Sequence, residues 1–158
     1  MELTLRQHGP NDAELPDILG LMRAAFAYMD GVVDPPSSIH QMTLATLETR
    51  AKEAEIWTLG PPVLACVVLQ IIPDALYIGK LSVAKDMRGQ GLSRRLIGHA
   101  MSRARAFGVT SLELESRVEL TDNHEVFLAM GFNEVARTSH PGFSKPTAIT
   151  FRCPVVPA

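Results

Sequence analysis

The stretch from Tyr77 to Phe107, YIGKLSVAKDMRGQGLSRRLIGHAMSRARAF, decides the fold of this chain. Its opening run, Tyr77 to Val83, is rich in apolar side chains and predicts a β-strand. From Leu92 onward apolar residues recur every three to five positions, which is the spacing of one face of an α-helix. Gly108 follows the last of them, where a left-handed C-cap is expected. The stretch therefore predicts a strand, a turn that contains glycine, and a helix.

The turn itself, RGQGLSR from Arg88 to Arg94, has the properties of an anion-binding site. Gly89 and Gly91 have no Cβ, so a ligand can approach their backbone closely. The first amides of a helix have no intrahelical partner, and the helix dipole adds partial positive charge there. A diphosphate is an anion that such a turn can hold.

The charges near the turn also favour an anion. No Asp or Glu occurs from Met87 to Leu112, whereas five arginines do. Arg88 and Arg94 flank the turn, and we expect both to contact the ligand. For Arg103 and Arg105, further along the helix, we favour an ordinary solvated helix face.

Two nucleotide-binding motifs can be compared with this turn. Gly89-x-Gly91 matches the start of the dinucleotide fingerprint G-x-G-x-x-G, although Arg94 stands at the third glycine position. Glu113 and Glu115 lie near the distance at which that fingerprint expects an acidic residue, so spacing alone leaves this alternative open. The P-loop pattern G-x-x-x-x-G-K-[ST] does not occur in the sequence.

The segment LSVAKDMRGQGLSRRLI resembles motif A of the GNAT superfamily of N-acetyltransferases, whose signature is [Q/R]-x-x-G-x-[G/A]. Arg88, Gly91 and Ser93 fall on the three specified positions. Ser93 departs from the Gly/Ala of the signature but is also small.

A second segment, Asn123 to Phe132, resembles another signature of the same family, an Asn and a Tyr ahead of a Gly-Phe pair. Phe127 stands where that tyrosine is common. The two segments occur in the expected order, and the resemblance covers most of the chain.

The resemblance implies that acetyl-CoA binds along the strand, the turn and the helix that carries the second signature. Leu81 and Val83 would offer backbone groups to the pantetheine arm, one of them an N–H near the thioester oxygen. The implied cofactor-binding residues are Leu81, Ser82, Val83, Arg88, Gly89, Gln90, Gly91, Leu92, Ser93, Arg94, Asn123 and Phe127.

Tyr77 and Glu115 are the candidate catalytic residues. Many relatives place an acidic side chain on this strand, or hold a water there with polar groups, and Tyr77 occupies about that position. A phenol with its usual pKa near ~10 is a poor base at neutral pH, but it can orient a water. Glu115 lies close to the end of the next predicted strand. For both residues, an ordinary place on the sheet surface is the alternative.

Acceptor selection is expected to fall to the loops Asp30–Ile39 and His140–Lys145. Asp30 and Asp34 are candidates for attracting a cationic amine, although Asp in such loops also serves turn chemistry. The histidines show no metal-ligand spacing with cysteines or carboxylates, so no metal is predicted.

The remaining chain predicts a single domain over residues 1–158. Hydrophobic periodicity predicts strands at 2–8, 56–59, 63–71, 77–83, 110–116, 132–139 and 147–152. It predicts four helices, which begin after Asp12, at a capping box Ser38-x-x-Gln41, at Leu92 and at a cap on Asp122. The fold class is therefore α/β with a mixed α+β sheet of about 6–7 strands and about 4 helices, the 56–83 strands forming an antiparallel meander and the 77 and 110 strands a parallel crossover pair.

Composition narrows the function. The net charge of −2 gives no basic field for nucleic acid or for a membrane surface, and no apolar run is long enough to span a bilayer. Only two cysteines occur, Cys66 in an apolar run and Cys153, which favours a reducing cytoplasm. We expect an acetyl-CoA-dependent N-acetyltransferase that acts on a primary amine of a small molecule or peptide; a homodimer stays open. The alternative is a non-catalytic acyl-CoA-binding sensor of the same fold.

Overall fold

The computed structural model describes residues 2–157 and contains a seven-stranded sheet in the order β1-β2-β3-β4-β5-β7-β6. The strands are β1 (Thr4–His8), β2 (Glu55–Gly60), β3 (Ala65–Ile72), β4 (Ala75–Val83), β5 (Ser111–Arg117), β6 (Asn133–Thr138) and β7 (Ala148–Pro154). The helices are α1 (Leu15–Phe26), α2 (Leu44–Glu53), α3 (Leu92–Phe107) and α4 (Thr121–Ala129), with short 3₁₀ segments η1 (Ala27–Met29), η2 (Ser38–Gln41) and η3 (Lys85–Met87). β4 and β5 are parallel and the other neighbours antiparallel, which confirms the predicted mixed sheet.

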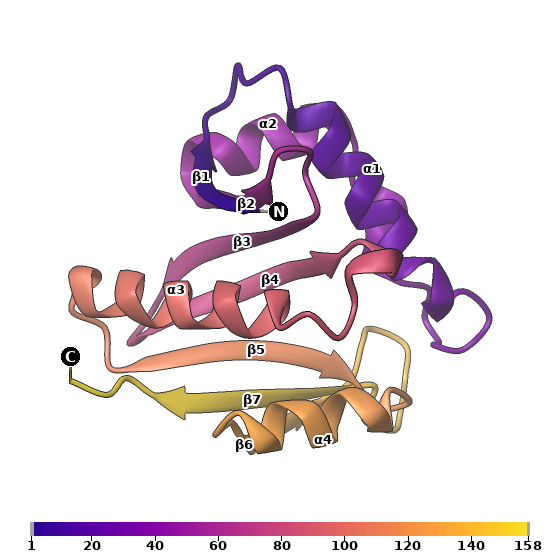
Figure 1. Ribbon diagram of the computed structural model, residues 1–158. Helices are drawn as coiled ribbons and strands as arrows, with labels where there is room; N and C mark the ends of the chain where they lie inside the picture. The colour runs from indigo at the N-terminus through magenta and orange to yellow at the C-terminus, as the bar shows by residue number, and fades with distance from the viewer. Residues whose placement is uncertain (1, 158) are drawn as a thin grey trace.

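Helices cover both faces of the sheet (Figure 1). α3 and α4 pack on one face, and α1 and α2 pack on the other. Strand β3 explains how the sheet serves both layers, because successive side chains point to opposite faces. Its Val67 and Leu69 join the core under α3, whereas Cys66 and Val68 join the core under α1. Cys66, which lies in an apolar run of the sequence, is buried.

Two predicted helix caps differ from the observed helix starts. Pro16 lies in the first turn of α1 as predicted, but no side chain caps this helix. Asp12 instead accepts a hydrogen bond from the backbone N–H of Glu14 at 2.8 Å, ahead of the first turn. In α4 the N-cap is Leu120, so the predicted cap at Asp122 is wrong. Asp122 lies inside the first turn, where a carboxylate still interacts favourably with the helix dipole.

The predicted start of the second helix is also wrong. Residues 38–41 form the separate 3₁₀ segment η2, in which the Ser37 hydroxyl accepts a hydrogen bond from the N–H of Ile39. The capping box of α2 lies five residues later than predicted, between Thr43 and Thr46. Thr46 supplies its hydroxyl at the position where glutamate or glutamine is usual, which hides the box from a sequence search.

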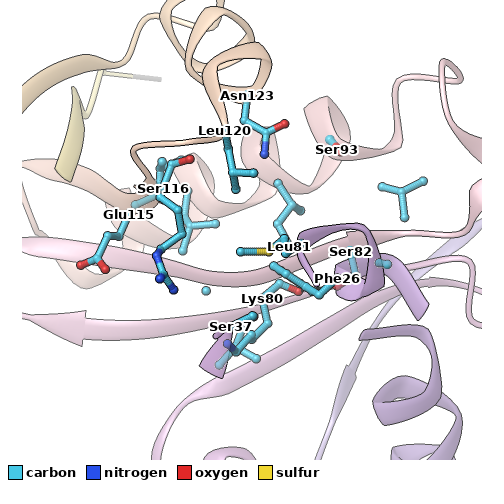
Figure 2. A pocket seen from close by; sticks show the side chains of 18 of the residues that line it. Phe26, Ser37, Lys80, Leu81, Ser82, Ser93, Glu115, Ser116, Leu120 and Asn123 are labelled. Atoms are coloured by element: carbon cyan, nitrogen blue, oxygen red, sulfur yellow. Dashed lines mark hydrogen bonds between the residues drawn. The ribbon is translucent and has the colours of Figure 1, made fainter. Parts of the chain in front are cut away.

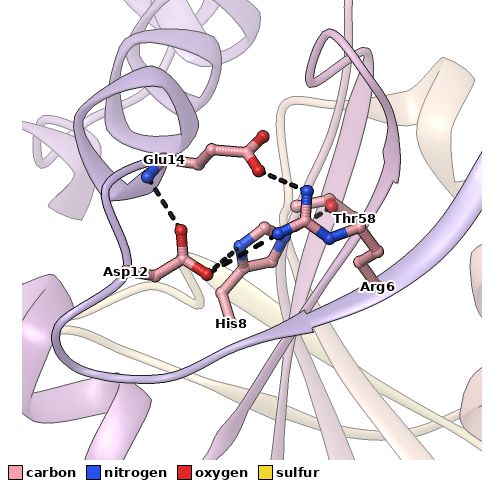
Figure 3. A network of polar contacts seen from close by, with 5 residues as sticks. All are labelled: Arg6, His8, Asp12, Glu14 and Thr58. Atoms are coloured by element: carbon pink, nitrogen blue, oxygen red, sulfur yellow. Dashed lines mark hydrogen bonds and ion pairs between the residues drawn. The ribbon is translucent and has the colours of Figure 1, made fainter.

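A polar network ties β1 to the start of α1 (Figure 3). The ring nitrogens of buried His8 lie 2.9 Å from Oδ2 of Asp12 and 2.7 Å from Oγ1 of Thr58. Arg6 forms an ion pair with Glu14. Potential ligand atoms of His8, Asp12 and Glu14 thus lie within 4.8 Å of one another, a grouping that sequence spacing did not indicate. Because protein partners already engage these groups, we interpret the network as structural.

The parallel pair β4–β5 is short. It consists of the pairs Ala75–Ser111, Leu76–Leu112 and Tyr77–Glu113. β4 continues to Val83 and β5 to Arg117 without further pairing between them. The two strands therefore diverge, and the edge of β4 that faces β5 beyond Tyr77 is left without a neighbouring strand.

Strand β4 also carries a β-bulge at Lys80. The β3–β4 register shifts between Cys66 and Val68, and Lys80 has a φ of 51°. A non-glycine residue with positive φ is uncommon, and a bulge of this kind re-aims a side chain. The sequence predicted a plain strand here.

Candidate functional site

The divergence of β4 and β5 opens onto a cavity of about 1290 Å³. Its walls come from both strands, the turn before α3, helix α4 and the segment 25–50. Figure 2 looks into this cavity: Leu120, the N-cap of α4, and Asn123 of α4 lie on one side, and Lys80 and Ser37 lie on the opposite side. The cavity thus reaches from the α3–α4 face of the sheet, through the gap between the strands, to the segment that follows α1.

The turn before α3 forms an open cradle at one end of this cavity. Gly89 and Gly91 have φ values of 78° and 79°, a conformation that L side chains rarely adopt. No atom lies within 4 Å of a Cβ built on either glycine, so the space beside their backbone is free. The backbone amides of residues 88–94 donate no hydrogen bond to any residue from 2 to 157. Free amides, open space and a helix start together fit a diphosphate.

The arginines of the turn and of α3 lie in different surroundings. Arg88 and Arg94 line the cavity beside the cradle, whereas Arg103 and Arg105 do not. Arg103 is more than a solvated residue, because it holds Glu55 of β2 in an ion pair with an Nε–Oε1 distance of 2.8 Å. Arg105 donates to a backbone carbonyl of the C-terminal segment at 2.6 Å.

The predicted cofactor-binding residues share this one cavity, with the exception of Gln90. Gln90 lies between the two left-handed glycines and is exposed. Ser82 is buried and donates to the carbonyl of Lys80 at 2.9 Å. The residues that line the cavity are Leu81, Ser82, Val83, Arg88, Gly89, Gly91, Leu92, Ser93, Arg94, Asn123 and Phe127.

Tyr77 and Glu115 line the same cavity from the two diverging strands. Burial, and then the charges of Glu115 and Glu113, raise the pKa of the Tyr77 phenol to about 12. The Tyr77 hydroxyl therefore stays protonated at neutral pH. Glu115 is exposed, and its carboxylate points away from Asn123 and Lys80 (Figure 2). Glu113 is held by Arg152, with an Nε–Oε1 distance of 2.8 Å.

The two residues of the second signature meet the cavity from α4. Phe127 is half-buried, and its ring packs edge-on against Phe132 and at a tilt against Phe151. Asn123 donates from its side-chain amide to the Tyr28 hydroxyl at 3.0 Å, which connects α4 with η1.

Sequence reasoning missed three cations of the cavity, Arg50, Lys80 and Arg117. Arg50 donates to the side-chain oxygen of Gln70. The Lys80 ammonium donates to the hydroxyl of Ser38 and lies 5.5 Å from the centre of the Phe26 ring. The Arg117 side chain is 8% exposed and donates to the carbonyl of Pro35. The sequence contains one signal for Lys80, which is the one charged residue of strand β4. Such breaks of a local pattern concentrate at functional sites.

The predicted acceptor loops both reach the cavity, but not through their acidic residues. Several residues of the loop after η1 line it, and His140 does so from the other loop. Asp30 and Asp34 do not line it. Asp30 pairs instead with His40 at 2.6 Å.

Comparison with known proteins agrees with this geometry. A profile of the acetyltransferase (GNAT) family matches residues 25–132. Among curated proteins no relative was found by sequence. No helix between residues 2 and 157 is both long enough and apolar enough to cross a membrane.

Solved structures share the fold over nearly the whole chain. The PaiA N-acetyltransferase of Thermoplasma acidophilum, solved with coenzyme A, has a TM-score of 0.81 at 12% identity and covers 98% of this chain and 99% of its own. An acetyltransferase of Streptococcus agalactiae gives 0.75 at 16% identity, with coverages of 98% and 99%. The ribosomal-protein-S18-alanine N-acetyltransferase of Escherichia coli gives 0.70 at 19% identity, with coverages of 98% and 96%.

These matches decide between the alternatives that the glycine turn left open. The dinucleotide fingerprint belongs to a sheet of mostly parallel strands, whereas here β4–β5 is the single parallel pair among the described strands. The family profile spans both segments on which the resemblance was based, Arg88–Ser93 and Asn123–Phe132. The chain is a member of the GNAT acetyltransferase family, a family of acyl-CoA-dependent N-acetyltransferases.

Proposed function

We propose that this protein transfers an acetyl group from acetyl-CoA to a primary amine of a small molecule or peptide, by direct attack in a ternary complex. The observation that carries the proposal is the divergence of β4 and β5 beyond Tyr77 and Glu113. One continuous cavity passes through this gap and has a diphosphate cradle at one end. A donor and an acceptor can therefore meet from opposite faces of the sheet.

The cofactor grip consists of backbone more than of side chains. The amides of residues 88–94 would bind the diphosphate, and Arg88 and Arg94 would add charge-assisted hydrogen bonds. The unpaired edge of β4 would bind the pantetheine arm through Leu81 and Val83, as an added strand does. Bound acetyl-CoA supplies the activated acetyl thioester. Phe127 would pack against the arm, and Asn123 would exchange its bond to Tyr28 for one to a cofactor amide.

Removal of the amine proton is assigned to Tyr77 and Glu115. Only an unprotonated amine has the electron pair for attack, so a group on the acceptor side has to receive the proton. Tyr77 is neutral at physiological pH because its pKa is raised to about 12, so its hydroxyl orients a water and does not act as the base. The Glu115 carboxylate is exposed at the rim of the cavity and receives the proton through that water.

A non-catalytic acyl-CoA sensor is the second candidate, because the Phe127 ring brings no proton donor into the cavity. One pair of measurements separates the two functions. Calorimetry with acetyl-CoA measures binding, and thiol release with a panel of amines measures turnover. We expect binding together with amine-dependent release of CoA. Binding without release by any amine would favour the sensor, and absence of binding would overturn both. The proposal keeps the cytoplasm as the site of action, in line with the two unpaired cysteines.

A further inference from the structure

The acceptor end of the cavity has an unusual charge distribution. Of its charged lining residues outside the cradle, Arg50, Lys80 and Arg117 are cationic. Glu115 is the single carboxylate that lines the cavity within residues 2–157. A site that attracts a purely cationic amine would be expected to show the opposite balance.

Lys80 and Arg117 converge on one short loop. Lys80 lies at the bulge of β4, and Arg117 is the last residue of β5. Both positions lie beyond the last β4–β5 residue pair, where the two strands diverge. Their head groups nevertheless bond to the hydroxyl of Ser38 and the carbonyl of Pro35. Three residues of chain span at most about 11 Å, so the two cations face the same small region.

Neither cation has an acidic partner. No ion pair to Lys80 or Arg117 is formed by any residue that the structure describes. Arg117 is 8% exposed, and its Nε is buried without a hydrogen-bond partner. Burial, and then the charge of Arg50, lower the pKa of the Lys80 ammonium. A buried cation is costly unless an anion or hydrogen-bond acceptors compensate it. Buried Arg117 has one carbonyl for this purpose and half-buried Lys80 has one hydroxyl, so a negatively charged group would complete the partners of both.

We propose that Lys80 and Arg117 bind a carboxylate of the acceptor, so that the substrate is an amino acid or another amine that carries a carboxylate. The inference rests on the proposed transfer to an amine. Arg117 would turn its free Nε–H toward the ligand, and Lys80 would add a second charge-assisted bond from the opposite strand. Ser37 and Phe26 lie beside Lys80 in the same cavity and bound the space for the rest of the acceptor (Figure 2).

The test compares acceptors that differ only in this charge. Amino acids from glycine to 6-aminohexanoate, and α-amino acids with apolar side chains, are each assayed beside the corresponding amide. Rates are expressed per free amine, because a nearby carboxylate raises the pKa of the amine. We expect at least one carboxylate acceptor to exceed its amide in kcat/KM by about 10-fold to 100-fold, the range of a charge-assisted hydrogen bond.

Variants then assign the preference to the two cations. Arg117→Gln and Lys80→Gln should each reduce the carboxylate-to-amide ratio about 10-fold or more, whereas Arg117→Lys should retain part of it. Arg105→Gln is the matched control, because Arg105 does not line the cavity, and its ratio should equal that of the wild type. Melting temperature and CoA affinity verify folding, and Lys80→Gln carries the test should Arg117→Gln unfold.

The outcomes separate this inference from the proposed function. Equal kcat/KM for acids and amides, with turnover intact, would overturn the carboxylate site alone. Faster transfer from succinyl-CoA than from acetyl-CoA to the uncharged amines, lost in Lys80→Gln, would assign the cations to the acyl group and overturn the acceptor site. Absence of turnover with every amine would overturn the acceptor proposal together with the transferase function.

Discussion

Tyr77 of β4 and Glu113 of β5 are the last pair of residues that join the two parallel strands. On the next position of β5 that faces the same way lies Glu115, which has no paired residue on β4. The gap between β4 and β5 therefore begins at the two proposed catalytic side chains, Tyr77 and Glu115. Because both side chains border this gap, we expect them to act together.

Tyr77→Phe and Glu115→Gln should each lower kcat by about 10²-fold, the lower end of acid–base contributions, with little effect on acetyl-CoA affinity. If the two groups act through one water, their effects on kcat should be non-additive. The kcat of the double variant should therefore be only slightly lower than that of the less active single variant. Steady-state kinetics at saturating acetyl-CoA measures this. Wild-type kcat in both singles would remove these residues from the mechanism.

The pH profile assigns the titrating group. In the wild type kcat/KM should rise with pH through one ionisation, because only the unprotonated amine attacks the thioester. Tyr77 is not the source of an ionisation near neutral pH, because its pKa is raised to about 12. The ionisation should therefore persist at the same pH in Tyr77→Phe. Its disappearance in that variant would show that the phenol itself titrates.

Gly91→Val should abolish measurable binding of CoA. The substitution places a branched side chain in the open space beside the cradle and forces a left-handed conformation on an L residue, which costs about 1–2 kcal/mol. Gly98→Ala is the matched control: it lies exposed within α3, has open space around it and should stabilise the helix by about 0.5–1 kcal/mol. Calorimetry and thermal melting test both. Undiminished affinity in Gly91→Val would show that the diphosphate binds elsewhere.

Phe127→Tyr should change turnover by no more than about 10²-fold, because a thiolate leaves readily and the ring already serves in packing. Thiol release with the best acceptor measures the change. An inactive wild type that gains activity on this substitution would identify the chain as an enzyme that has lost its proton donor.

Asp12→Ala should lower the free energy of unfolding by about 1–2 kcal/mol, because it removes acceptors for the Glu14 amide and for His8. The amide hydrogen bond, and with it the charge of His8, lowers the pKa of Asp12 from 3.8 in spite of burial. A carboxyl group whose pKa is lowered on folding stabilises the fold. This stabilisation is fully present above the pKa of the unfolded state and is lost as the pH falls through the pKa of the folded state.

The difference in stability between wild type and Asp12→Ala should therefore be constant near neutral pH and shrink below about pH 4. Urea unfolding at several pH values measures it, with Glu125→Ala on exposed α4 as the control. A difference that grows toward acid pH would contradict the assignment.

The cradle could be predicted from sequence because it depends on adjacent residues. Gly89, Gly91 and the start of α3 are local features, and the conformations of both glycines follow from their chemistry. Part of the strand order could likewise be predicted, because apolar periodicity and short connections restrict which strands can be neighbours in the sheet.

The acceptor end could not be predicted in this way. All of α3 and most of β5 lie between Lys80 and Arg117 in the sequence, and both side chains reach the cavity only because a bulge redirects Lys80 and the strands diverge beside Arg117. Both features depend on register between strands, which no local pattern encodes. The same reason explains Thr43: its partner Thr46 replaces the usual glutamate, so the cap is recognised only in three dimensions.

The short β4–β5 pairing divides the sheet into two groups of strands, one from β1 to β4 and one from β5, β7 and β6. Three residue pairs and the core beneath α3 connect them, so this narrow strip is where local opening should cost the least free energy. A cofactor that bridges the gap adds contacts to both groups at once and stabilises the bound state by mass action. Amide hydrogen exchange along β5 should accordingly slow when CoA is added, because the bound ligand takes the place of the β4–β5 pairing that is absent beyond Tyr77.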